Sequence, residues 1–377
     1  MRDERVAARL GLWLGGAMLI CFLTGLLSHF QQHPVGWAPI GPKPVWGYRL
    51  SQGLHVTTGL AAVPLLLAKL HAVYPRLFAR PPVRGVLHGL ERAGIGLLVA
   101  ATCLELVTGV MNIAQWYPWG FGFVPVHHAV AWLAIGGLAV HIAAKLPVIR
   151  RALRTPLDEE TPPDVEARPD GDGSTPEGAE RRGFLTAALV VAGGLTVLSV
   201  GQTIRPLQRL ALLAPRRPGS GPQGLPVNRT AADAGVDEAA TGPGWVLQLD
   251  GPAGRRRLTL VDLAAMPQTA AELPIACVEG WSATAHWRGV PIGDLVRLAG
   301  GTASSVVRVE SLEVRGAYRA TTLPAAFAAD PRTLLALELN GAVLDLEHGF
   351  PARLIAPNRP GVLQTKWVAR LLVEGGR

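Results

Sequence analysis

The chain has 377 residues, a formal net charge of +8, 49% apolar residues and only 17% charged residues. This length allows two or more domains, and the apolar content together with a mean hydropathy of +0.27 indicates membrane segments rather than an ordinary soluble protein. The basic residues lie in loops beside apolar runs and form no aromatic-interleaved patch, so we do not expect a nucleic-acid partner.

Five apolar runs are each long enough to cross a lipid bilayer as a helix, which takes about 20 residues. The first four are separated by short loops and predict an all-α transmembrane bundle, residues 1–154. The fifth stands apart and predicts a separate anchor helix. The runs are approximately 9–30, 54–74, 90–113, 126–148 and 184–204.

The distribution of arginine predicts how these helices are oriented. The loop after the second run and the segment after the fourth are rich in arginine, whereas residues 115–125 carry no charge. By the positive-inside rule, the N-terminus is cytoplasmic and the bundle begins and ends on that side. We therefore expect a multi-pass protein in the bilayer of the bacterial inner membrane.

Two of the bundle helices carry histidines at similar depths. His55 and His127 lie near the outer ends of the second and fourth runs, and His71 and His141 lie near the inner ends. At 1.5 Å per residue, the two histidines of each helix are roughly 21–24 Å apart along its axis. Several intramembrane histidines in one bundle imply a function. The arrangement suits bis-histidine ligation of two b-type haems.

The choice among neighbouring histidines follows from helix rotation. His127 and His141 are nearly four turns apart and share a face, whereas His128 and His141 do not, so we favour His127 as the ligand and keep His128 as an alternative. His29, near the outer end of the first run, could replace an outer ligand. His55 and His71 point almost oppositely on a straight helix, unless Pro64 kinks it.

The bundle also contains a short internal repeat. Leu23-Thr24-Gly25-Leu26 in the first run recurs as Val107-Thr108-Gly109-Val110 in the third, and glycine there would let a flat macrocycle approach. Ordinary packing of small residues explains the repeat equally well. The bundle resembles the four-helix cytochrome b of bacterial oxidoreductases, which implies a membrane quinone as partner. Glu105 is a candidate for a proton pathway or a quinone site, or else a buried structural carboxyl.

The segment after the bundle has the composition of a linker followed by an export signal. Residues 155–180 are rich in Pro, Gly, Asp and Glu and predict a disordered cytoplasmic linker. Arg181-Arg182 then precede the anchor, residues 181–205, and resemble a twin-arginine signal. A domain that acquires its cofactor in the cytoplasm needs a route for folded cargo, so we expect the twin-arginine export machinery as a partner and an extracytoplasmic C-terminal domain. An ordinary positive-inside anchor is the alternative.

The C-terminal part has a soluble composition. A second linker, residues 206–226, is dense in Pro and Gly. Alternating apolar residues predict strands at 245–249 and 306–309, and short helical patterns occur at 258–266 and 292–299. We expect residues 227–377 to form an α+β domain rich in strand.

One of the three cysteines stands in a context suited to chemistry. Cys21 and Cys103 lie inside apolar runs, where cysteine is usually a small buried hydrophobe. Cys277 lies in Cys277-Val278-Glu279-Gly280-Trp281, and Trp, His, Arg and Lys follow at intervals. A thiolate ligates soft or high-valent metals, and arginine and lysine neutralise phosphate.

Four separated elements in this order resemble the molybdopterin-binding domain of the sulfite oxidase family, from about Pro226 to Val373. The resemblance implies that Cys277 ligates molybdenum and that Trp287, within His286-Trp287-Arg288-Gly289-Val290, lines the catalytic pocket. It also implies that molybdopterin is held by His348 and Arg353 of the His-Gly-x-Pro-x-Arg element, by Lys366 of the Lys-Trp element, and by the early segment Asn228, Arg229 and Thr230.

Two departures from that family concern the substrate. Glu279 stands where sulfite oxidases have basic residues, and Leu337 stands where they have a tyrosine before Glu-x-Asn-Gly. An acidic residue beside the metal opposes binding of a dianion. Oxygen-atom transfer from a small substrate such as a sulfoxide is therefore favoured over oxidation of an oxyanion, with electrons exchanged with quinone through the haems. Alternatives are a haem-free anchor, or a non-catalytic membrane-anchored pterin-fold protein that binds or senses.

Overall fold

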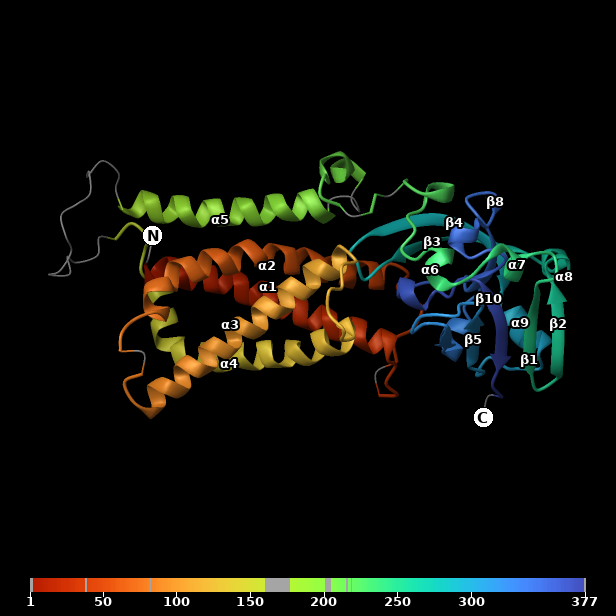
Figure 1. Ribbon diagram of the computed structural model, residues 1–377, viewed down its shortest axis with the longest axis horizontal. Coiled ribbons are helices and arrows are strands. Elements are labelled where there is room, and N and C mark those ends of the chain that lie inside the picture. The colour runs from red at the N-terminus through yellow and green to blue at the C-terminus, as the bar shows by residue number, and fades with distance from the viewer. Residues whose placement is uncertain are drawn as a thin grey trace. The chain divides into compact units, whose positions relative to one another are not determined.

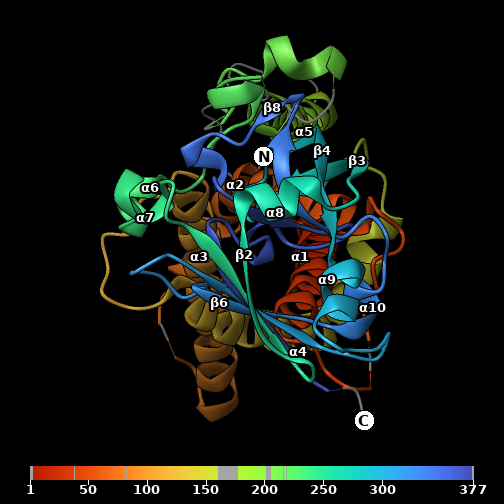
Figure 2. The ribbon, with the colours of Figure 1, turned by 90° about the vertical axis from the view of Figure 1, so that its right-hand side faces the viewer.

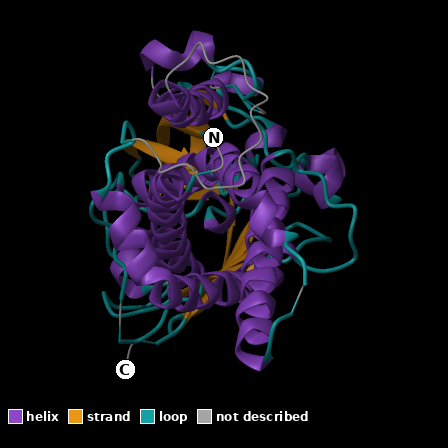
Figure 3. Ribbon diagram, turned by 90° about the vertical axis from the view of Figure 1, so that its left-hand side faces the viewer, coloured by secondary structure: helices purple, strands orange, loops and turns teal. Residues whose placement is uncertain are grey.

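The structure, a computed structural model, describes residues 3–37, 39–81, 83–159, 177–200, 205–214, 216–217 and 219–375. The chain divides into two compact units. The first comprises residues 1–25, 54–201 and 210–213, and the second comprises residues 26–53, 202–209 and 214–377. Every strand of the described residues belongs to the second unit. The strands are orange in Figure 3.

Five long helices confirm the five predicted apolar runs, and each is long and apolar enough to cross a membrane. Helix α2 begins at Gly47, ahead of the predicted run, because its polar first turns also make helical hydrogen bonds. The helices, labelled in Figure 1, are α1 (Glu4–Gln32), α2 (Gly47–Leu77), α3 (Val86–Ile113), α4 (Phe123–Arg154) and α5 (Glu177–Val200).

The helical unit packs around small and aliphatic side chains. Leu10 of α1 and Leu65 of α2 share one buried cluster with Ala188 and Ala192 of α5, so α5 is packed into this unit together with the other helices. Large apolar side chains remain exposed on the helices, such as Val140. Exposed apolar surface of this kind is typical of a face that contacts lipid.

An ion-pair network joins the start of α5 to the N-terminus of the chain. Arg181 Nε and Arg5 Nη2 each lie 2.9 Å from Asp3 Oδ2, and all three side chains are largely buried. Arg5 also donates to the carbonyl oxygens of Pro156 and Glu159. Most of the predicted linker, residues 160–176, lies outside the described residues.

One sheet of the second unit contains five strands in the order β2-β1-β10-β5-β6. Only the β1–β10 pair is parallel. Edge strand β2 carries three consecutive arginines, which discourage pairing with another chain. The strands are β1 (Val246–Gly251), β2 (Gly254–Thr259), β5 (Val307–Ser311), β6 (Ala320–Leu323) and β10 (Val368–Val373).

The other sheet is antiparallel, with the order β3-β4-β7-β8 and with β9 also paired to β7. Its strands β3, β4 and β8 are labelled in Figure 2. Along β4, buried and exposed side chains alternate, which turns Trp287 inward and Arg288 outward. The strands are β3 (Thr269–Ala276), β4 (Ser282–Pro291), β7 (Leu334–Leu339), β8 (Ala342–Val343) and β9 (Arg353–Ile355).

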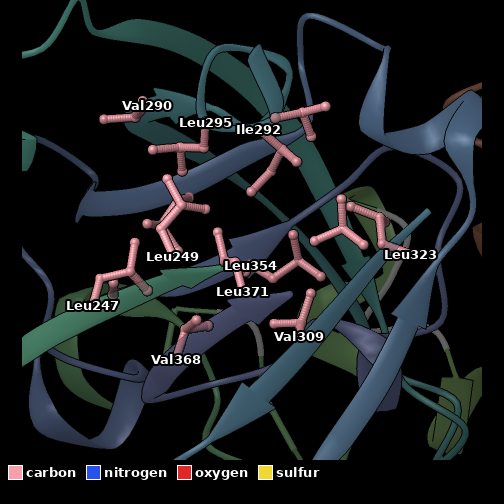
Figure 4. Packing of buried hydrophobic residues seen from close by; sticks show 14 of the residues in the cluster. Leu247, Leu249, Val290, Ile292, Leu295, Val309, Leu323, Leu354, Val368 and Leu371 are labelled. Carbon is pink, nitrogen blue, oxygen red and sulfur yellow. The ribbon is translucent and has the colours of Figure 1, made fainter. Parts of the chain in front are cut away.

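A hydrophobic core lies between these elements and draws on both sheets (Figure 4). Leu249 of β1, Leu371 of β10 and Leu354 of β9 are fully or almost fully buried in it. The predicted helices at 258–266 and 292–299 are α8 (Leu260–Ala265) and α9 (Ile292–Leu298). The prediction of a strand-rich α+β domain is confirmed. Leu225, at the end of the predicted second linker, is 2% exposed and packs in this unit's other buried cluster.

Candidate molybdopterin site and bundle histidines

Cys277 lies in the hairpin loop between β3 and β4. The Cys277 N–H donates to the Trp281 carbonyl oxygen at 3.0 Å, and the Gly280 N–H donates to the Cys277 carbonyl oxygen at 3.1 Å. The thiol is 1% exposed, and the Asn228 side-chain amide lies 3.9 Å from its sulfur. Burial raises the pKa of the Cys277 thiol, and the neighbouring Glu279 carboxylate raises it further. A bound metal ion would reverse this effect, because coordination deprotonates a thiol.

Two buried cations lie in the same unit, and neither makes an ion pair with a carboxylate among the described residues. Arg353, at the start of β9, is 4% exposed and lies over the Trp287 ring at 5.5 Å. Its Nη1 donates to the His348 carbonyl oxygen at 3.2 Å, and its Nε has no hydrogen-bond partner among the described residues. Lys366 Nζ donates to the carbonyl oxygens of Arg229 at 2.8 Å and Glu347 at 2.7 Å.

Burial and mutual repulsion depress the pKa values around these cations. The pKa of Lys366 falls to about 7, first through burial and then through Arg353, and burial lowers the pKa of Arg353 to about 10. Burial, and then Arg353, lower the pKa of His348 to about 4. An anion such as a phosphate group would offset this accumulation of positive charge. The residues of this site therefore fit the anionic molybdopterin group.

The His-Gly element lies close to the Lys-Trp element. His348, in a short 3-10 helix (Leu346–His348), faces the Pro222 carbonyl oxygen through Nε2 at 2.7 Å. Gly349 follows with φ 107°, and a Cβ there would lie 3.1 Å from Cα of Lys366. Glycine is thus needed for both the backbone conformation and the close approach.

Residues 228–230, the predicted early pterin-contacting segment, each make a different kind of contact. Asn228 reaches the Cys277 sulfur, and the Arg229 carbonyl oxygen accepts from Lys366. The Arg229 guanidinium lies 3.5 Å from Glu313 instead. The Thr230 hydroxyl caps helix α6 (Ala231–Ala234) by accepting from the Asp233 N–H, so its side chain has a local structural partner.

Glu279, the acidic residue that stands two positions after Cys277, has its own hydrogen-bond and ion-pair partners. Glu279 is 6% exposed and accepts a hydrogen bond from Trp281 Nε1 at 3.1 Å. Arg216 Nε lies 3.7 Å from the same carboxylate. The contact between Arg216 and Glu279 could not be predicted from a local pattern, because the two residues are far apart in the chain. This arginine offsets part of the negative charge beside Cys277.

In the helical unit, the structure turns His127 rather than His128 toward His55. The His55 and His127 ring centroids lie 6.3 Å apart, whereas the His128 ring contacts Trp132. The His71 ring lies 5.8 Å from Phe184 of α5, and no ring contact with His141 occurs among the described residues. His29 stacks beside His33, with ring centroids 4.7 Å apart.

Equivalent threonines of the internal repeat orient the two facing rings. Thr108 Oγ1 lies 3.2 Å from His127 Nδ1. His55 Nδ1 lies 2.9 Å from the Cys21 carbonyl oxygen and 3.3 Å from Thr24 Oγ1. Each threonine hydroxyl donates to a carbonyl of its own helix, so its oxygen can accept from the ring. Holding Nδ1 in this way leaves Nε2 available to a metal.

The space around the two rings also fits a metal group. A Cβ on Gly25 would come within 3.1 Å of His55 Cε1, which makes glycine important at this position. The separation of the ring centroids leaves room for one metal ion with a nitrogen ligand about 2 Å away on each side. His127 Nε2 faces Glu105 Oε2 at 3.1 Å, and a metal bond would replace that contact. The outer histidines therefore fit a haem iron, and the inner pair has no comparable geometry.

Comparison with known families agrees with the site. The oxidoreductase molybdopterin-binding domain family matches residues 234–375. The C-terminal domain is therefore a molybdopterin-dependent oxidoreductase domain.

Particular relatives match shorter parts of the chain. The YedZ1 protein of Azospira oryzae, named as a subunit of a protein-methionine-sulfoxide reductase, is 34% identical over 115 residues, which is 30% of this chain and 43% of that protein. Mitochondrial sulfite oxidase of Drosophila melanogaster is 30% identical over 154 residues, 34% of this chain and 27% of that enzyme. The chain thus spans less than half the length of these relatives. The sulfane dehydrogenase SoxCD structure from Paracoccus pantotrophus aligns at 23% identity and TM-score 0.33, covering 42% of this chain and 46% of that one.

The depressed pKa of Lys366 predicts a pH effect on the cofactor-free protein. An unfolded lysine has a pKa of about 10.4, so between pH 7 and 10 the unfolded chain binds one more proton than the folded chain. The free energy of unfolding should therefore rise with pH across this window, and Lys366→Met should remove this contribution. Thermal unfolding of both proteins at pH 7 and pH 9 checks the difference; parallel pH profiles would contradict it.

Proposed function

We propose that this protein is a membrane-bound molybdenum oxidoreductase, which exchanges electrons between a molybdenum centre in the C-terminal domain and membrane quinone through b-type haem in the helical unit. The observation that carries the proposal is the burial of Arg353 and Lys366 without a carboxylate, in the unit that also buries Cys277. When bound, molybdopterin-coordinated molybdenum supplies two-electron oxygen-atom chemistry.

The chain's own residues would bind and orient this group. Cys277 would ligate the metal, and Asn228 would contact the thiolate that forms. Arg353 and Lys366 would neutralise the pterin phosphate, with Trp287 supporting the guanidinium from below. His348 would remain neutral and hold the Pro222 segment through its ring. Burial of Cys277, Arg353 and Lys366 would exclude water from the metal.

Reduction of a small substrate such as a sulfoxide, with electrons from quinol, is the favoured direction. Glu279 beside Cys277 disfavours oxyanions, although Arg216 offsets part of its charge. The name of the Azospira oryzae relative supports the same substrate class. Following haem reoxidation against sulfoxides, N-oxides and oxyanions tests the choice; reoxidation by oxyanions alone would reverse it.

Cys277→Ser should remove one sulfur ligand from molybdenum and abolish turnover, because an alkoxide replaces the thiolate. X-ray absorption at the molybdenum edge should count one sulfur fewer in this variant than in the unaltered protein. Cys103→Ser, in α3, serves as the matched control and should leave the spectrum unchanged. An unchanged sulfur count in Cys277→Ser would contradict the assigned ligand, and a wild-type protein without molybdenum would favour the non-catalytic binding function.

The haem part of the proposal rests on the facing pair His55 and His127. A second haem at His71 and His141 is supported by sequence depth alone. His127→Ala should lose the b-haem band of the outer site in a reduced-minus-oxidised spectrum, because one axial ligand is gone. His128→Ala, the adjacent control, should retain it. Haem-free membranes in the unaltered protein would instead favour the anchor without electron transfer.

We further propose that the C-terminal domain is extracytoplasmic in the bacterial inner membrane and is exported folded by the twin-arginine machinery. Replacing Arg181 and Arg182 with Lys should leave this domain in the cytoplasm, as measured by its protection from protease added outside spheroplasts. Lys in place of Arg150 and Arg151 gives a control pair of the same chemistry. Equal external exposure of both variants would exclude the signal.

A further inference from the structure

The segment that joins α1 to α2 belongs to the same compact unit as the molybdopterin-binding domain. Residues 26–53 cluster with residues 214–377, and α2 therefore begins inside this unit at Gly47. Val45 packs against the buried cluster that contains Cys277. The site described above is therefore in contact with a part of the chain more than two hundred positions earlier.

Asn358 uses both ends of its side-chain amide on this segment. Its Oδ1 accepts from the Tyr48 N–H at 2.6 Å, and its Nδ2 donates to the Gly41 carbonyl oxygen at 2.8 Å. Asn358 is 5% exposed and follows β9, the strand that begins with Arg353. A Cβ on Gly47 would lie 2.7 Å from the Asn358 Oδ1, so the segment sits tightly against this amide.

Gln52, on the same segment as Tyr48, contacts the loop of residues 277–281, which carries the proposed metal ligand Cys277. Its Nε2 donates to the Val278 carbonyl oxygen at 3.2 Å, and its Oε1 accepts from the Tyr48 hydroxyl at 3.4 Å. Gln52 is 5% exposed, so this is a buried amide with both ends engaged. Val278 directly follows Cys277, and the loop also has main-chain hydrogen bonds of its own. The Gln52 amide therefore holds the peptide between Val278 and Glu279, one residue beyond Cys277.

We propose that Gln52 is a positioning residue of the molybdenum site: its side-chain amide fixes the Val278 carbonyl and thereby the direction in which Cys277 presents its sulfur. The inference rests on the proposed function. It also gives α2 a double role, because His55, the proposed haem ligand, follows Gln52 by three residues in the same helix. Helix α2, which carries the proposed haem ligand His55, then also orients the loop that carries the proposed molybdenum ligand Cys277.

Gln52→Glu tests the hydrogen bond, because it keeps the size of the side chain and removes the donor. Hydrogen–deuterium exchange of residues 277–281 in the cofactor-free protein should accelerate about tenfold, the value of one buried hydrogen bond. Gln32→Glu is the matched control. Gln32 accepts from the Tyr318 hydroxyl at 3.2 Å and donates to the Ser28 hydroxyl at 3.2 Å, so Gln32→Glu also removes a donor but none that bonds residues 277–281. Exchange of residues 277–281 in this control should stay within about twofold.

A second measurement separates positioning from mere stabilisation. In the loaded protein, Gln52→Glu should retain molybdenum but shift the electron paramagnetic resonance signal of the partly reduced metal, which depends on the orientation of the thiolate. Gln52→Met provides a second donor-free variant should the glutamate variant fail to accumulate.

Three results would each overturn the role of Gln52. Hydrogen–deuterium exchange could be unchanged in Gln52→Glu, it could rise equally in Gln32→Glu, or it could be faster in Gln52→Glu while the resonance signal stays unshifted. A wild-type protein without molybdenum would overturn the proposed function instead, while the exchange experiment would still report on the hydrogen bond.

Discussion

The site depends on two buried positive charges, Arg353 and Lys366, that make no ion pair with a carboxylate among the described residues. Arg353 and Lys366 hydrogen-bond only to carbonyl oxygens among the described residues, and each depresses the pKa of the groups around it. A protein interior holds such cations at a high cost in free energy unless an anion joins them. The core of the two sheets supplies the rigidity that keeps them in place. The match to a domain that binds molybdopterin, a phosphate-bearing cofactor, agrees with this electrostatic requirement.

The helical unit supplies hydrogen-bond partners to two imidazole rings that lie in an apolar environment. A threonine hydroxyl lies within hydrogen-bond distance of Nδ1 in both His55 and His127, the Cys21 carbonyl oxygen lies still closer to His55 Nδ1, and each threonine donates to its own helix. The repeated threonine–glycine pair therefore serves both rings, although only Gly25 is in tight contact with its histidine. This local pairing is what supports the proposed haem position between the two rings.

The boundary between the two compact units does not coincide with the boundary between membrane helices and soluble sequence. Helix α2 starts in the unit of the molybdopterin-binding domain, where Gln52 and Asn358 make buried amide contacts across the segment. A domain cut at residue 227 would lose these contacts. The loop that contains Cys277 therefore contacts a part of the chain that composition alone assigns to the bundle.

The sequence by itself determined the five apolar helices, the strand-rich C-terminal domain and the chemical context of Cys277, because hydrophobic periodicity and local composition are short-range properties. Only the tertiary structure decided which histidine faces His55, since adjacent residues on a helix differ by about 100° in direction. It also gave Thr230 a capping role, and paired Arg216 with Glu279 and Gln52 with Val278. These contacts join residues far apart in the chain, or depend on how a side chain is turned, and no local pattern encodes either.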